Sequence, residues 1–460
     1  MINRKTLITL LVAVMTAGGA KAQKQWTLVD CVQYAMHNNI TLKKARLQKQ
    51  AAAEEVKGSR GALLPTLSAS TNQSLGYTPW MDNGVTTVTN GQVNTKVQKT
   101  YYNGSYGLNA QWTVWDGGRL RGNLQLSQLA EQQAQLDVNE QINSVNERIA
   151  QLFVQCLYLN EAIGVSQASL ETSRKNEERG QAMVDVGQMS RADLAQLSAQ
   201  RATDEYNVVE AQAQLQNYKL QLKQLLELKA DEEFDIAVPQ ETDDEVLKAI
   251  PALQDVYQQA LTNRPEIENA QLSIESSRIS TKIARAGWMP QVSLTGGLST
   301  STNSRSSNGW DSQMKTNFSM AGGLQVSIPI FDGRQTKTAV SRARIQEQQA
   351  VLDMQDRQKT LYQTIEQYWL DATTNQQKFR AATTTVESEE QSYELLSEQF
   401  RLGLKNIIEL LQGKDKLLQA QQNRLQSKYL TLLNQQMLRF YTLGGITDEE
   451  LEFLESPGVE

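Results

Sequence analysis

The chain is poor in the residue types that carry most enzyme chemistry. Its 460 residues include one histidine and two cysteines. His37 has no cysteine, carboxylate or second imidazole at ligand spacing around it, and the sequence offers no serine–histidine–aspartate set, cysteine–histidine pair or glycine-rich phosphate loop. We therefore predict a protein that is not an enzyme and that has no metal or cofactor, with His37 on the surface.

The two cysteines are too few for a disulfide framework. Cys31 and Cys156 could pair in an oxidising compartment, but Cys156 lies in the apolar seam of a predicted long helix. A buried thiol in such a seam behaves as a small hydrophobe. We favour two unpaired thiols, with a disulfide as the alternative.

Long apolar runs are missing after the first residues. Arg4 and Lys5 precede an apolar run over 7–14, and small residues precede Gln23, which predicts a signal peptide over 1–22. No cysteine directly follows the expected cleavage site, so we expect an exported chain without a lipid anchor. No later stretch is long and apolar enough for a membrane-spanning helix.

The chain has fewer basic than acidic residues. The formal net charge is −6 at pH 7, and it becomes −9 when Arg4, Lys5 and Lys21 leave with the signal peptide. Binding to a phosphate backbone requires the opposite balance, so we expect no nucleic-acid partner.

What the chain does contain is a copy of itself. The segment over 35–65 recurs 225 positions later over 260–290, and Trp115-Asp116-Gly117 recurs 216 positions later as Phe331-Asp332-Gly333. The second copy is nine residues shorter between these anchors, a change that a hairpin loop tolerates. The expected parts after the signal peptide are a first repeat over 23–250, a second repeat over 251–445 and an acidic tail over 446–460.

Side chains alternate with period two in each copy, which predicts strand hairpins at about 66–115 and 291–330. One face is apolar and the other carries uncharged polar residues, a pattern that suits a membrane barrel or a water-facing sheet equally. The stretches over 82–98 and 301–315 are rich in Asn, Ser, Thr and Gly, which predicts exposed loops.

Aromatic residues favour the membrane barrel, because they gather at both ends of the predicted strands as interfacial girdles do. The group next to the helices is Trp112, Trp115, Trp288 and Phe331, and the group near the hairpin tips is Tyr77, Trp80, Tyr101, Trp310 and Phe318. Between the two groups each strand runs about ten residues, enough to cross a bilayer when tilted.

Four strands cannot close a barrel, and an open sheet edge in lipid leaves backbone N–H and C=O groups unpaired. The chain must therefore share its barrel with further copies. Two copies give eight strands and a lumen filled by side chains, whereas three give twelve strands and room for water or solute. The polar inner face favours the trimer.

The remaining sequence is helical with heptad spacing, which predicts long antiparallel helix hairpins at about 119–228 and 334–443. In the last helix the predicted seam begins at Ile408 and Leu411. The segment over 229–250 breaks the heptads and is expected to pack outside the helices with the tail. A solvated coiled coil without a lumen is the alternative. Together, the patterns predict a mixed α and β membrane protein, in which a shared barrel continues into a long α-helical coiled-coil barrel in the periplasm.

Two turn motifs, over 186–194 and 400–410, combine a Val-Gly or Leu-Gly turn with an acid six residues later. They resemble the tip motifs of the TolC-type outer-membrane efflux family, and the resemblance covers essentially the whole mature chain. It implies a homotrimer in the Gram-negative outer membrane that docks a periplasmic adaptor and, through it, an inner-membrane pump. Expected docking residues, with left-handed helix caps at the two glycines, are Gly187, Gln188, Met189, Ser190, Gly403, Leu404 and Asn406.

The resemblance also implies a periplasmic gate made of Asp193, Phe400, Lys405, Glu409 and Gln412. In the family pattern the first-copy acid is linked to a second-copy arginine and tyrosine, but this chain has Lys405 and Phe400 at those positions. Lysine makes no planar bidentate contact and phenylalanine donates no hydrogen bond, so we expect a weaker latch. The alternative is that Asp193 and Lys405 are solvated surface charges.

We therefore predict a passive trimeric exit duct for an efflux or type I secretion system. The alternatives are a barrel-anchored structural or adhesive coiled coil and a periplasmic scaffold. A wide lumen lined by Ser, Asn and Gln selects by size and charge only, so drugs, metal ions, siderophores and proteins are all compatible cargoes.

Overall fold

The computed structural model of the chain describes residues 25–80, 85–89, 92–96, 98–229, 231–238 and 243–443. The predicted signal peptide and acidic tail lie outside these residues. The described chain forms two compact units. The helical unit contains residues up to 46, 137–267 and 357 onward, and the sheet unit contains 47–136 and 268–356. Each unit holds pieces of both sequence copies.

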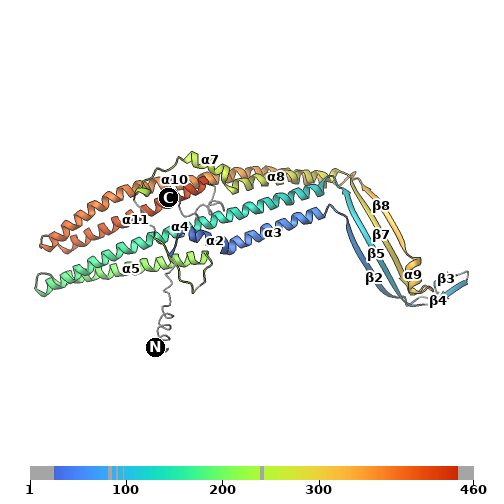
Figure 1. The fold of residues 1–460 in the computed structure, drawn as a ribbon, viewed down its shortest axis with the longest axis horizontal. Coiled ribbons are helices and arrows are strands. Elements are labelled where there is room, and N and C mark those ends of the chain that lie inside the picture. Colours follow the sequence, from blue (N-terminus) through green and yellow to red (C-terminus); the bar gives the residue numbers. More distant parts are fainter. Residues whose placement is uncertain are drawn as a thin grey trace, which may run out of the picture. The chain divides into compact units, whose positions relative to one another are not determined.

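The sheet unit is built on four antiparallel strands in the order β2-β5-β7-β8 (Figure 1). These strands are β2 (Thr66–Tyr77), β5 (Thr100–Trp115), β7 (Gln291–Asn303) and β8 (Ser319–Ser327). Among the described strands, β2 and β8 are the sheet edges, and the central pair β5 and β7 joins one strand from each copy.

The register confirms the two-faced pattern, because directly opposed residues share a face of the sheet. One row across the four strands is apolar and consists of Ala69, Leu108, Leu298 and Met320. The next row is small and polar and consists of Ser70, Gly107, Ser299 and Ser319. A bulge at the end of β5 alters the strict alternation: Thr113 pairs with Ser293, but Trp115 pairs with Val292, which brings Trp115 into the apolar rows.

Three predicted boundaries in the sheet unit are wrong. The expected loop over 82–98 contains an antiparallel hairpin of β3 (Val85–Thr89) and β4 (Gln92–Lys96), since β-branched Val and Thr residues favour strands. The expected loop over 301–315 loses its start to β7 and its end to helix α9 (Trp310–Thr316). β8 ends at Ser327 rather than near 330, because Pro329 has no N–H for a ladder and restricts the residue before it.

Aspartates begin the long helices at the same place in both copies. Leu120 N–H donates to Asp116 at 3.0 Å at the start of α4 (Arg119–Asp185), and Thr336 N–H donates to Asp332 at 2.7 Å at the start of α10 (Gln335–Arg401). Hydrogen bonds from Thr336 lower the pKa of Asp332.

Helices α2 to α5 of the first copy have equivalents in the second. Helices α2 (Leu28–Asn38) and α3 (Ile40–Gly61) recur 225 positions later as α7 (Leu253–Asn263) and α8 (Pro265–Arg285). The long hairpins recur 216 positions later: α5 (Arg191–Leu225) returns along α4, and α11 (Ile407–Leu443) returns along α10 (Figure 1). None of the described helices has the length and the apolar run needed to cross a membrane.

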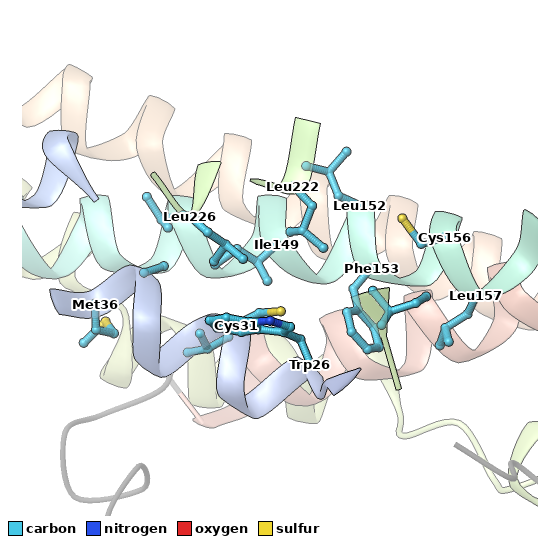
Figure 2. Packing of buried hydrophobic residues seen from close by; sticks show 14 of the residues in the cluster. Trp26, Cys31, Met36, Ile149, Leu152, Phe153, Cys156, Leu157, Leu222 and Leu226 are labelled. Atoms are coloured by element: carbon cyan, nitrogen blue, oxygen red, sulfur yellow. The ribbon is translucent and has the colours of Figure 1, made fainter. Parts of the chain in front are cut away.

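Equivalent positions build equivalent cores. The first cluster joins residues flanking and within α2 to α4 and α5, as Figure 2 shows for Cys31, Ile149 and Leu222. The second cluster uses the equivalent positions and includes Val256, Ile365 and Leu438. Among the described residues Cys31 and Cys156 form no disulfide, as predicted; both are buried, and burial raises the pKa of Cys156 to about 12. His37 is exposed at the end of α2, also as predicted.

The predicted seam is confirmed along most of the long helices, but its start in α11 is wrong. Ile408 is 54% exposed, whereas Ile407 and Leu410 are buried. The inward face of α11 is therefore displaced by one residue at this end.

The backbone of the described part of the segment over 229–250 contacts strand β1 and a side chain of α10. Its β6 (Asp235–Ile236) pairs in parallel with β1 (Gln25–Trp26). After α6 (Asp243–Val246), the Gln376 side chain donates to the carbonyls of Val246 and Lys248 at 2.8 Å.

Candidate functional site at the helix hairpin tips

The turn between α4 and α5, residues 186–190, is tip 1. Gly187 has φ +76°, Gly187 N–H donates to the Val184 carbonyl at 3.0 Å, and Gln188 N–H donates to the Met183 carbonyl at 2.8 Å. This pair of bonds is a Schellman motif, which requires the left-handed conformation that glycine adopts without strain.

The turn between α10 and α11, residues 402–406, is tip 2 and repeats the motif. Gly403 has φ +73°, and the amides of Gly403 and Leu404 donate to the carbonyls of Phe400 and Gln399 at 3.0 and 2.9 Å. The left-handed caps predicted at both glycines are confirmed.

Side chains cap the helices that leave the tips. Ser190 Oγ accepts from Asp193 N–H at 3.0 Å at the start of α5. Asn406 Oδ1 accepts from Glu409 N–H at 2.9 Å at the start of α11, and Asn406 N–H donates back to Glu409 at 3.3 Å. Ser190 and Asn406, expected as docking residues, therefore also shape the tips.

The acids and the lysine of the predicted gate pair within their own tips. The Ser190 hydroxyl donates to Asp193 at 2.8 Å, and Lys405 Nζ lies 2.7 Å from Glu409. This i,i+4 pair lowers the pKa of Glu409 through the lysine hydrogen bond. No contact in the described chain joins Asp193 to Lys405, and Gln412 is exposed. The gate itself stays a prediction, but its expected link is not formed within this chain.

An apolar cluster packs the two hairpins together just behind the tips. Its buried members are Leu197, Phe400, Ile407 and Leu410, with Met189, Tyr393 and Leu411 packed against them. Phe400 is 6% exposed, so its side chain contributes to this core rather than to a tip surface. Met189, expected on the docking surface, also packs inward. The other expected docking residues, Gly187, Gln188, Ser190, Gly403, Leu404 and Asn406, are exposed.

Two segments of the chain, residues 31–227 and 256–444, match the family model described as outer membrane efflux protein. The chain belongs to the outer membrane efflux protein family. The matched segments include both sequence copies and both tips.

Individual relatives are similar over nearly their whole length. The chain is 23% identical to the outer membrane protein TolC of Salmonella enteritidis, over 98% of this chain and 89% of that protein. It is 22% identical to the alkaline protease secretion protein AprF of Pseudomonas aeruginosa, over 92% of this chain and 85% of that protein. The fold is similar to the solved outer membrane channel CmeC of Campylobacter jejuni, with a TM-score of 0.74 at 20% identity, covering 91% of this chain and 85% of that one.

In this outer membrane efflux protein, the aromatic residues expected at membrane surfaces lie at the two ends of the described sheet. Next to the helices, Trp112 and Trp115 end β5, Trp288 ends the 3-10 helix η1 (Ala286–Trp288), and Phe331 follows β8. At the other end are Tyr77 and Tyr101 in β2 and β5, Trp80 after β2, Trp310 in α9 and Phe318 before β8. Their contact with lipid stays a prediction.

Several of these aromatic residues are fixed by specific contacts. Trp112 Nε1 donates to the Leu63 carbonyl at 2.9 Å, ahead of β2. The Arg305 guanidinium carbon lies 3.7 Å from the centre of the Tyr101 ring, which attaches the turn after β7 to β5.

One further set of residues was missed by the sequence reasoning. Asp204 of α5 and Lys414 of α11 form an ion pair in which both side chains are almost wholly buried. Asp204 lies at seam spacing between Leu197 and Val208, so a charged residue at a seam position was the available signal. Lys414 gave no such signal, because the seam predicted for α11 was displaced by one residue.

Proposed function

We propose that the chain is the outer-membrane component of a periplasm-spanning efflux or type I secretion system, in which three copies form a passive exit duct. The duct performs no chemistry and has no energy source of its own. Its helical part lies in the periplasm, where the tips dock a periplasmic adaptor that connects the duct to an inner-membrane efflux or ABC-type pump.

The two-faced sheet is the observation that carries this proposal. One face presents apolar rows and the other uncharged polar rows, and the edge strands β2 and β8 need partners if the sheet lies in lipid. Further copies of the chain supply those partners when β8 of one copy pairs with β2 of the next. Three copies then enclose a twelve-stranded wall with the polar rows facing a lumen.

The relatives support the same assignment. AprF is named for protease secretion, and CmeC is an outer membrane channel. A homologous duct in this chain requires no catalytic residues, which agrees with the scarcity of histidine and cysteine.

The tips support docking and gating in different residues. Exposed apolar side chains surround both tip glycines, with Val186 at 68%, Leu402 at 61% and Leu404 at 71% exposure. Such side chains suit an apolar partner surface. We assign the gate to the polar residues nearby, where Asp193 and Glu409 place a carboxylate in each hairpin.

Recording of the purified protein in planar bilayers tests the proposal. We expect cation-preferring conductance that is nearly closed at rest, because the tip acids favour cations. A folded trimer that conducts no current would instead favour a structural or adhesive coiled coil.

Matched substitutions on adjacent residues of β7 test the direction of the two faces. Leu298→Arg places a charge in an apolar row, at a cost of about 2–4 kcal/mol if that row meets the middle of a bilayer. We expect it to block membrane assembly. Ser299→Arg, on the polar face, should assemble and shift selectivity towards anions. The opposite result would mean that the faces are assigned the wrong way round.

A further inference from the structure

A buried ion pair joins the two helix hairpins a short way behind the tips. Lys414 of α11 contacts Asp204 of α5, and their side chains are 4% and 1% exposed. The remaining ion pairs between described residues are more exposed on at least one side. Each hairpin therefore contributes one charge to a site that excludes water.

Neighbouring polar groups complete the site. The Ser173 hydroxyl of α4 donates to the carboxylate of Asp204 at 2.5 Å. The Gln200 amide of α5 donates to Asp204 at 3.3 Å and to Asp415 of α11 at 3.2 Å. Three of the four long helices thus converge on one carboxylate and one ammonium group.

This ion pair has no equivalent at the positions that the internal duplication relates to it. The residues 216 positions after Asp204 and before Lys414 are Ala420 and Ser198. Neither can form an ion pair, so the twofold equivalent of the link is missing. The ion pair therefore joins the two hairpins at one place only, between Asp204 of α5 and Lys414 of α11.

The two kinds of contact near the tips restrain motion differently. The apolar cluster around Phe400 and Leu410 is non-directional, so these helices can slide or turn while they stay buried. The Asp204–Lys414 pair is directional, and moving α11 along α5 would leave both charges buried and unpaired, which is strongly unfavourable. The pair therefore selects one register of the second hairpin against the first.

We propose that Asp204 and Lys414 are positioning residues that fix this register and hold the tips of each protomer in the resting, closed arrangement. The proposal rests on the proposed duct function. It concerns a link inside the protomer, separate from the tip residues Asp193, Lys405 and Glu409. Opening then requires α11 to separate from α5 at this site or the two hairpins to move together as one body.

The test uses the full-length trimer in planar bilayers and the double variant Asp204→Asn with Lys414→Met. Replacement of both partners avoids an unpaired buried charge, so the variant should fold with a melting temperature close to that of the wild type. We expect its conducting fraction at rest to rise about tenfold. Hydrogen exchange of the amides over 402–413 should also become faster, because the register is no longer fixed.

Matched controls lie one and two residues away. Glu205→Gln removes an exposed acid of α5, and Lys416→Met removes an exposed lysine of α11, so both variants should conduct and exchange as the wild type does. Asp204→Asn alone should lower the melting temperature, since it leaves Lys414 buried without its countercharge.

The outcomes separate the two proposals. A double variant that folds normally and shows wild-type conductance and exchange would overturn the positioning role. A wild-type trimer that conducts no current would contradict the duct function, while the exchange measurement would still test the register.

Discussion

The two copies of the repeat make the same bend at equivalent positions but stabilise it with different chemistry. In the first copy Asn39, buried between α2 and α3, accepts from the amides of Thr41 and Leu42 at 2.9 and 3.2 Å. It also donates to the Leu225 carbonyl at 2.9 Å. In the second copy the equivalent residue, between α7 and α8, is the buried Arg264.

Arg264 lies among carboxylates and aromatic rings instead. Its Nε donates to Glu266 at 2.8 Å, and its Nη2 lies 3.9 Å from Glu147. The guanidinium carbon is 4.4 Å from the centre of the Tyr441 ring, and Tyr441 stands 216 positions after Leu225. The comparison shows that the helix bounds and the apolar positions define the bend, whereas its polar contacts can be neutral or charged.

The largest expected effect distinguishes the charged contacts of Arg264 from the neutral contacts of Asn39. Arg264→Ala leaves Glu147 and Glu266 partly buried without their cation, and we expect it to lower the free energy of unfolding by about 3–5 kcal/mol. Asn39→Ala removes a neutral cap and should cost about 1–2 kcal/mol. Denaturant titration of the detergent-solubilised protein measures both.

Arg264→Met is the control for packing, since it keeps the long side chain without the charge. If Arg264→Met is as stable as the wild type, packing of the long side chain and not its charge stabilises the bend. Equal costs for Arg264→Ala and Asn39→Ala would mean that the two chemistries are energetically interchangeable.

The next effect concerns a glycine that faces a leucine of the neighbouring helix. The glycine lies on the first helix of the hairpin in one copy and on the second helix in the other copy. A Cβ on Gly180 of α4 would lie 2.5 Å from Leu197 Cδ1 of α5, and a Cβ on Gly413 of α11 would lie 2.7 Å from Leu396 Cδ1 of α10. Leu197 is buried, whereas Leu396 is half-buried and has room to move. We expect Gly180→Ala to cost about 1–3 kcal/mol and Gly413→Ala less.

Gly164→Ala is the matched control, because nothing lies within 4 Å of its added Cβ in α4. It should stabilise the protein by about 0.5–1 kcal/mol, the helix-propensity difference between Ala and Gly. A neutral Gly180→Ala in the same melting experiment would show that Leu197 can change rotamer.

These glycines also show what the sequence could predict. Gly187 and Gly403 were assigned correctly because a left-handed cap depends on local geometry, and Cys156 because heptad spacing marks a buried seam. The close approach of Gly180 to Leu197 could not be predicted, because it depends on the three-dimensional distance between two helices. Such a distance leaves no mark on either helix alone.

Pairing of charges was the least predictable part of the site. Lys405 of tip 2 lies four residues before Glu409 of α11, and this local pair forms within the chain in place of a link to Asp193. The motif predicts a gate role for Phe400, but its packing depends on Leu197 of the first hairpin. In both cases the position of a residue in a turn does not determine its contacts within the chain.

The third effect is a pH dependence of stability, which has opposite signs at the partly buried Glu147 and at Glu409 beside tip 2. Burial raises the pKa of Glu147 above its ordinary 4.5, so stability is lost as the pH rises from the ordinary value through the raised one. The pKa of Glu409 is lowered by Lys405, so its contribution is lost as the pH falls below 4.5. The slope from Glu147 is below about 1.4 kcal/mol per pH unit, the limit for one group.

Melting temperatures between pH 4 and 8 of Glu147→Gln and Glu409→Gln test these signs. Relative to the wild type, Glu147→Gln should gain stability as the pH rises, and Glu409→Gln should gain it as the pH falls. Slopes of the same sign would contradict the assignment of burial to Glu147 and of the ion pair to Glu409.

The smallest effect concerns the joint between strand and helix, where the copies differ at one backbone position. Gly118 has φ +89°, and its equivalent Arg334 has φ +72°. A left-handed conformation costs a residue with a side chain about 1–2 kcal/mol, and the extra unfolded-state entropy of glycine offsets about 0.5–1 kcal/mol of that. Arg334→Gly should therefore stabilise the protein by about 0.5 kcal/mol, and Gly118→Ala should destabilise it by a similar amount, since nothing lies within 4 Å of the added Cβ. If Arg334→Gly lowers the melting temperature instead, contacts of the Arg334 side chain outweigh the strain. The two copies would then differ at the joint in the same way as at the bend, with a charged side chain in the second copy where the first has a neutral residue.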